Sequence, residues 1–124
     1  MKQKFYICEH CGNIAALLRN AGVPLYCCGE KMQEMIPGTT EASGEKHMPV
    51  FYIENGIVHV TVGSVEHPMT REHYIEWICL ETEHGIQYAN LDPYDEPRAK
   101  FAICEGDEVR AVCAFCNQHS LWRN

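Results

Sequence analysis

The chain has 124 residues, of which 46% are hydrophobic, and this suits one ordinary domain or one small domain with a smaller module. The net charge of -7 argues against nucleic acid and anionic membrane surfaces as partners, because like charges repel. No segment has the roughly 18 consecutive apolar residues of a membrane span, and the first residues lack the apolar stretch of a signal peptide. We therefore expect a cytoplasmic protein with no membrane partner.

Eight cysteines and seven histidines are the most informative feature of the composition. Disulfides rarely persist in a reducing cytosol, so most of these thiols need another role. Thiolate together with imidazole is a ligand set that suits zinc, copper or iron rather than calcium or magnesium. The composition therefore predicts a metalloprotein.

Charge and loop signals predict two domains, residues 1–38 and 39–124. The first carries a net charge of +1 and the second a net charge of -8. Pro37 and Gly38 mark the boundary with the loop chemistry that commonly joins domains. A chain below about 40 residues rarely buries enough apolar surface to fold without a metal, a disulfide or a partner.

Four cysteines in the first domain predict the metal that it needs. Cys8 and Cys11 form a C-x-x-C pair, Cys27 and Cys28 are adjacent, and a glycine that lets the chain curl around an ion follows each pair. Tetrahedral four-sulfur sites hold either zinc or iron. The adjacent pair departs from the usual zinc ribbon, because neighbouring side chains on an extended strand point to opposite sides.

Beyond residue 48 the sequence predicts short strands. Asn55 and Gly56 between the apolar runs 50–53 and 57–62 predict a β-hairpin. Turn residues bound further expected strands at 74–82, 85–91, 99–105 and 108–115, and residues 15–18 would form at most one helical turn. This pattern predicts a mainly β protein with an immunoglobulin-like antiparallel β-sandwich. We expect its inner faces to hold Val58, Val60, Val62, Ile75 and Trp77.

Five residues of the second domain lie outside or at the ends of the predicted strands and have metal-ligand chemistry: His47, His67, His73, Cys116 and His119. Loops on a rigid sandwich commonly carry function. Spacing alone does not show that these residues converge, and a single histidine is more often a surface or hydrogen-bonded residue than a ligand.

The order of the motifs resembles desulfoferrodoxin, the two-iron class of superoxide reductase. The similar segments of the second domain are EKHMPV at 45–50, GSVEHPM at 63–69, HYIEWI at 73–78 and CNQH at 116–119. In the first domain, CEHCGN at 8–13 and CCGEKM at 27–32 are similar to the family's desulforedoxin-like module. One departure is Ser120, which stands where a glycine is usual after the last histidine.

The resemblance implies two iron ions per chain. It places one on four thiolates, and the other on four equatorial imidazoles and one axial thiolate with the sixth position open. Carried over position by position, the first set is Cys8, Cys11, Cys27 and Cys28, and the second is His47, His67, His73, His119 and the thiolate of Cys116.

The resemblance also implies a reaction and partners. Superoxide is reduced by one electron to hydrogen peroxide, an external donor such as rubredoxin re-reduces the iron, and the protein is a homodimer. Lys46 presents a positive charge at the open position, and Glu45 supplies a carboxylate that occupies this position when the iron is ferric.

The remaining cysteines and histidines have simpler interpretations. His10, His59 and His84 are left outside the metal sites, and we expect Cys79 and Cys104 to be small core residues. Cys113 forms a C-x-x-C pair with Cys116, which could suggest a redox pair or a zinc knuckle, but it is assigned no ligand role. Two other functions stay open: a non-catalytic metal-binding module with a zinc ribbon, and a rubredoxin-like electron carrier.

Overall fold

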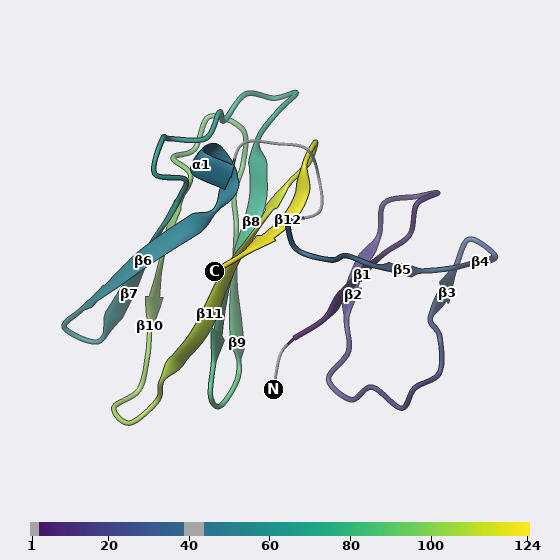
Figure 1. Ribbon diagram of the computed structural model, residues 1–124, viewed down its shortest axis with the longest axis horizontal. Helices are drawn as coiled ribbons and strands as arrows, with labels where there is room; N and C mark the ends of the chain where they lie inside the picture. The colour runs from purple at the N-terminus through teal and green to yellow at the C-terminus, as the bar shows by residue number, and fades with distance from the viewer. Residues whose placement is uncertain (1–2, 39–43) are drawn as a thin grey trace. The chain divides into compact units, whose positions relative to one another are not determined.

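The computed structural model describes residues 3–38 and 44–124. The chain divides into two compact units, Met1–Ile36 and Pro37–Asn124, each with its own strands (Figure 1). In the described ranges, no helix is long and apolar enough to cross a membrane.

Unit 1 consists of very short strands. A three-stranded antiparallel sheet has β1 (Phe5–Ile7) in its centre, flanked by β2 (Ile14–Ala16) and β5 (Gln33–Glu34), and β3 (Tyr26–Cys27) pairs with β4 (Glu30–Lys31). Ala15 pairs with Tyr6, so the chain is extended where the sequence allowed one helical turn. The buried apolar side chains are only Phe5, Cys8, Met32 and Met35 among the described residues of this unit. So small a core needs further stabilisation.

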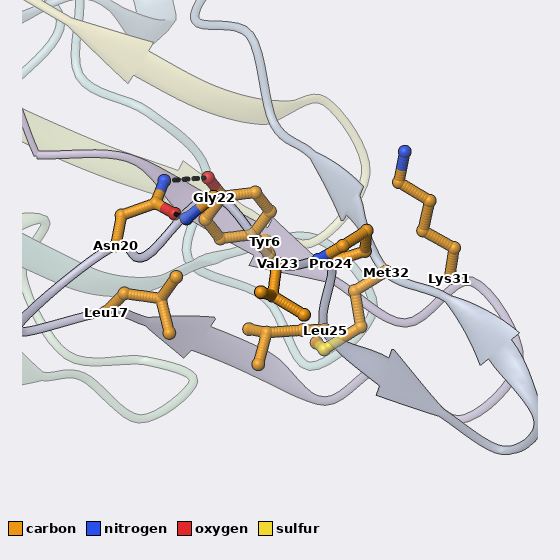
Figure 2. A pocket seen from close by; sticks show the side chains of 9 residues that line it. All are labelled: Tyr6, Leu17, Asn20, Gly22, Val23, Pro24, Leu25, Lys31 and Met32. Carbon is orange, nitrogen blue, oxygen red and sulfur yellow. Dashed lines mark hydrogen bonds between the residues drawn. The ribbon is translucent and has the colours of Figure 1, made fainter.

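A cavity of about 200 Å³ lies within unit 1, with mostly apolar side chains around it (Figure 2). The side-chain amide of Asn20 donates a hydrogen bond to the Tyr6 hydroxyl at 3.3 Å. The lining residues are Tyr6, Leu17, Asn20, Gly22, Val23, Pro24, Leu25, Lys31 and Met32. None of them is a cysteine, so the cavity is distinct from the four thiols.

Unit 2 contains the predicted antiparallel β-sandwich (Figure 1). One sheet has the order β10-β7-β6 and the other β12-β11-β8-β9. A single-turn helix, α1 (Gly44–His47), precedes the first strand. The strands are β6 (Pro49–Glu54), β7 (Ile57–Val62), β8 (Ile75–Thr82), β9 (Ile86–Asn90), β10 (Arg98–Ala102), β11 (Val109–Cys116) and β12 (Ser120–Arg123).

The predicted hairpin is confirmed as β6 and β7. Glu54 pairs with Ile57, which leaves Asn55 and Gly56 as a two-residue loop with φ of 51° and 74°. Positive φ at both positions is the type I′ geometry, whose twist matches that of the strands. Strand β12 was not expected from the sequence, because it is a short strand directly after the last motif.

The core prediction is correct for four residues and wrong for Trp77. Val58, Val60, Val62 and Ile75 are almost fully buried in the cluster between the sheets, whereas Trp77 is half-buried and stacks on Phe115 on the other face of its sheet. Phe115 pairs with Trp77 and Cys116 with Ile75, so one extra residue of β8 lies between these pairs. This β-bulge ends the alternation of sides that had predicted Trp77 in the core.

Candidate metal centres

Two turns of unit 1 hold the first group of thiols. The chain after β1 folds so that the Gly12 N–H donates to the Cys8 carbonyl at 2.8 Å, with Gly12 at a φ of 84°. This turn carries Cys8 and Cys11. Two backbone N–H groups point at its sulfurs, from Cys11 to Cys8 Sγ and from Asn13 to Cys11 Sγ, both at 3.5 Å.

The turn between β3 and β4 explains how the adjacent residues Cys27 and Cys28 can bind one ion, although neighbouring side chains on a strand point to opposite sides. Cys27 pairs with Glu30, so Cys28 and Gly29 form a two-residue loop with φ of 55° and 75°. The left-handed conformation of Cys28 ends the side-to-side alternation of the strand. Both sulfurs therefore lie on the same side, 3.9 Å apart.

The four sulfurs form a compact cluster. The ligand atoms of Cys8, Cys11, Cys27 and Cys28 all lie within 4.8 Å of one another, and the Cys11 and Cys27 sulfurs are 3.6 Å apart. A tetrahedral ion with metal–sulfur bonds of about 2.3 Å requires sulfurs about 3.8 Å apart. The observed spacing fits such an ion.

Crowding among the thiols shifts their pKa values in opposite directions. The N–H of Cys11 lowers the pKa of Cys8 to about 6, whereas interaction with the Cys11 thiol raises the pKa of Cys28 to about 12. Four neighbouring thiols cannot all ionise without a cation among them. A bound divalent or trivalent ion removes this conflict, because metal-bound thiols are deprotonated.

Unit 2 brings together a second group from four segments of the chain. His47 ends α1, His67 lies in the loop after β7, His73 lies just before β8, and Cys116 ends β11. Their ligand atoms all lie within 4.8 Å of one another. His119, in the turn before β12, joins the group through Nδ1, which is 3.0 Å from His47 Nε2 and 3.9 Å from Cys116 Sγ. The predicted convergence of the five side chains is therefore present.

The positions of the imidazole nitrogens fit a bound metal. His47 Nε2 lies 3.1 Å from His67 Nε2 and 3.0 Å from His119 Nδ1. Two nitrogens bound at right angles, about 2.1 Å from one ion, are about 3.0 Å apart. The Nε2 atom of His73 is buried without a hydrogen-bond partner, although a buried polar nitrogen normally has one.

The surroundings of His67 and His73 favour the neutral form of these two rings. Burial lowers the pKa of His67 to about 4, and burial also lowers the pKa of His73, with help from the charges of His119, His47 and Lys46. The Pro68 carbonyl lies 2.6 Å from His67 Nδ1 and can only accept, so Nδ1 carries the proton and Nε2 carries the lone pair, which faces the other ligand atoms. Neutral imidazole is the form that binds a metal.

The two candidate catalytic residues belong to α1, the helix that ends with His47. Glu45 and Lys46 are exposed residues of α1, directly before the buried His47. The positive charge of Lys46 is near enough to lower the pKa of His73. The helix is held by the Glu45 carbonyl, which accepts the N–H of Ser64 at 2.8 Å.

Gly63 closes the chain tightly against α1. Its φ is 85°, and a Cβ added to it would lie 2.7 Å from the Lys46 carbonyl oxygen and even closer to that of Val65. Its N–H donates to the Met48 carbonyl at 2.9 Å. Only glycine satisfies both the conformation and the space, so this residue fixes the helix that carries His47.

Other histidines lie outside the two clusters. His10 is exposed, His59 stacks on Tyr52 with ring centroids 4.6 Å apart, and His84 faces Asp107 at 3.1 Å.

The remaining cysteines divide into a buried pair and an exposed residue. Cys79 and Cys113 are buried opposite each other in β8 and β11, outside both clusters. The prediction of Cys104 as a core residue is wrong, since it is exposed beyond the end of β10. The apolar strand pattern continued to Cys104, but regular pairing ends at Ala102.

Two residues around the second group, Trp122 and Asn117, were not predicted from the sequence to have a role. The Trp122 ring stacks on His47 with centroids 5.1 Å apart, and its Nε1–H donates to the His119 carbonyl at 3.1 Å. Asn117 bonds to the backbone on both sides of His73. Only its place inside a ligand motif could have drawn attention to Asn117, and nothing in the sequence connects Trp122 with His47.

The fold and the two clusters define a class: a small mainly β protein with one four-thiolate site and one site of histidines and a thiolate. Residues 39–124 match the family described as desulfoferrodoxin, and residues 1–35 match the desulfoferrodoxin N-terminal domain. The chain belongs to the desulfoferrodoxin family.

Relatives and a solved structure agree over nearly the whole chain. A desulfoferrodoxin of Nitratidesulfovibrio vulgaris is 45% identical over 97% of this chain and 94% of its own, and a desulfoferrodoxin homolog of Archaeoglobus fulgidus is 43% identical over 96% and 94%. The crystal structure of the superoxide reductase from Treponema pallidum has a TM-score of 0.85 and 36% identity, covering 100% of this chain and 99% of that one.

Proposed function

We propose that this protein is a superoxide reductase with two iron sites. The observation that carries the proposal is the convergence of four imidazoles and one thiolate from distant segments, with His73 Nε2 buried and without a partner. The first iron is held by Cys8, Cys11, Cys27 and Cys28. The second is held by His47, His67, His73, His119 and Cys116.

An iron bound by the second group would supply the single electron that reduces superoxide, and two protons from solvent would complete hydrogen peroxide. The side chains bind this ion with neutral imidazoles and one thiolate, which leaves ferrous iron a formal charge of +1 that favours an anion. We assign to the Cys116 sulfur the role of thiolate ligand, which would donate electron density to a bound iron.

Lys46 and Glu45 act on the substrate and product. The Lys46 ammonium is exposed and near enough to lower the pKa of His73, and it attracts superoxide into a protein whose net charge is -7. The neighbouring Glu45 carboxylate is also exposed on α1, and we assign it the displacement of the product from the site.

Compartment, donor and assembly complete the proposal. None of the eight cysteines, all of which lie in the described residues, forms a disulfide, and this agrees with a reducing cytoplasm. An external one-electron donor such as rubredoxin renews the ferrous state. A homodimer would cover exposed apolar side chains such as Leu18, Val23 and Ile53, and sedimentation would give twice the chain mass.

Rapid mixing with superoxide tests the activity. The reduced protein should form peroxide without releasing dioxygen, Cys116→Ala should lose this reaction, and the matched control Cys104→Ala should keep it. The spectrum of the four-thiolate site should be unchanged in both variants. Peroxide formation by Cys116→Ala at the wild-type rate would contradict the proposal, and so would inactivity of the iron-loaded wild type.

A further inference from the structure

Asn117 bonds to the peptide groups on both sides of His73. Its Oδ1 accepts the N–H of Tyr74 at 3.0 Å, and its Nδ2 donates to the Glu72 carbonyl at 3.0 Å. Its own N–H donates to the Tyr74 carbonyl at 3.2 Å. One residue beside Cys116 thus makes three bonds across the segment that carries His73.

These bonds extend the sheet beyond its last regular pair. Strands β11 and β8 end their pairing at Cys116 and Ile75. Beyond that point the side-chain amide of Asn117 offers one donor and one acceptor, as a peptide group does, and continues the ladder past His73. An aspartate could accept from Tyr74 but could not donate to Glu72.

The hydrogen bonds of Asn117 are not needed to satisfy its own side chain. This side chain is exposed, so water could satisfy its amide at little cost. The buried group that depends on the segment is His73 Nε2, which has no hydrogen-bond partner. The bonds fix where this nitrogen lies relative to the Cys116 sulfur.

We propose that Asn117 is a positioning residue, which sets the geometry of the second metal site by holding the His73 segment against the Cys116 loop. The inference rests on the proposed function only in using the same site. Outer hydrogen-bond partners of this kind typically change metal affinity by about 10–100-fold when removed.

Gln118 is the matched control. Its side-chain amide donates to the same Glu72 carbonyl at 2.8 Å, and it is also exposed and next in sequence. It does not bond to Tyr74 in the structure, so it touches only one side of His73. Its loss should cost a similar surface hydrogen bond without freeing the ring.

Cobalt(II) titration of the metal-free full-length chain tests the inference. We expect Asn117→Ala to raise the dissociation constant of the histidine-containing site by about 10–100-fold and to shift its thiolate-to-cobalt absorption band. Asn117→Asp should give a smaller rise, and Gln118→Ala a change within twofold. The four-thiolate site should bind cobalt as in the wild type in every variant, which shows that unit 1 is intact, and an unchanged circular dichroism spectrum should show that unit 2 has folded.

Either of two results would overturn the inference. One is an unchanged cobalt affinity in Asn117→Ala, whatever its unfolding stability, and the other is an equal weakening in Gln118→Ala. If Asn117→Ala does not fold, wild-type affinity in Asn117→Asp overturns it. The cobalt titration contains no superoxide and therefore tests the inference separately from the activity. A wild-type protein that binds cobalt here but forms no peroxide in rapid mixing would contradict the proposed function and leave the role of Asn117 untouched.

Discussion

Replacing Gly63 by alanine should weaken both the fold of unit 2 and its metal site. The residue has a φ of 85°, and a left-handed conformation costs an L-residue about 1–2 kcal/mol. The added Cβ would also meet the Lys46 and Val65 carbonyl oxygens, the former at 2.7 Å, and these are backbone atoms that must move. Overpacking of this kind typically costs a further 1–3 kcal/mol, so we expect a total loss of about 2–5 kcal/mol.

Gly56→Ala separates the two causes. Gly56 has a φ of 74°, but the nearest atom to an added Cβ is the Ile103 carbonyl oxygen at 3.7 Å, an ordinary contact. This control should lose only about 1–2 kcal/mol.

Urea unfolding of the metal-free protein measures both losses, and cobalt titration follows the second site. Because the clash in Gly63→Ala pushes on α1, which carries His47, only this variant should bind cobalt more weakly. Equal losses of stability and equal cobalt affinity in the two variants would refute the reasoning.

Three further experiments test other parts of the structure. Lys46→Ala should slow the bimolecular reaction with superoxide by roughly tenfold and weaken its dependence on salt in rapid mixing, whereas Lys100→Ala removes the same charge from an exposed position on β10 and should change the rate little. Iodoacetamide followed by peptide mass spectrometry should label exposed Cys104 well before buried Cys79, because burial raises the pKa of the Cys79 thiol. Ser120→Gly should stabilise unit 2 by about 1 kcal/mol in urea unfolding, because Ser120 has a φ of 63°.

Each of these predictions has a clear contrary result. Equal rates and equal salt slopes for the two lysine variants would remove the role of Lys46. Labelling of Cys79 as fast as Cys104 would contradict the burial of that strand. A less stable Ser120→Gly variant would show that the serine side chain contributes more than its backbone conformation costs.

The local sequence was sufficient to predict the hairpin of β6 and β7. Asn55 and Gly56 favour a two-residue type I′ loop wherever they occur between apolar runs, so the register of β6 and β7 followed from local sequence. The alternation of Val58, Val60 and Val62 likewise indicated the core face.

Features that depend on tertiary pairing could not be obtained in this way. Trp77 was misplaced because a bulge opposite Phe115 and Cys116 exists only once β8 and β11 pair. The adjacent cysteines were difficult to place because the left-handed conformation of Cys28 overrides the strand pattern. Cys104 was misplaced because its strand ends two residues earlier than its apolar pattern suggests.

The metal sites fall between these cases. Spacing identified the cysteines of unit 1, because each pair lies in a single glycine-containing turn. Convergence of His47, His67 and His119 depends on α1, two loops and the sandwich that supports them. Only the resemblance of several ordered motifs to a family could predict this convergence in advance.

Metal analysis of the protein from iron-replete cells, combined with its visible spectrum, tests the central claim most directly. The account predicts two irons per chain, one for each cluster, with separate sulfur-to-iron bands from the four-thiolate site and from Cys116. A preparation that contains zinc alone, or iron only in the four-thiolate site, would contradict it.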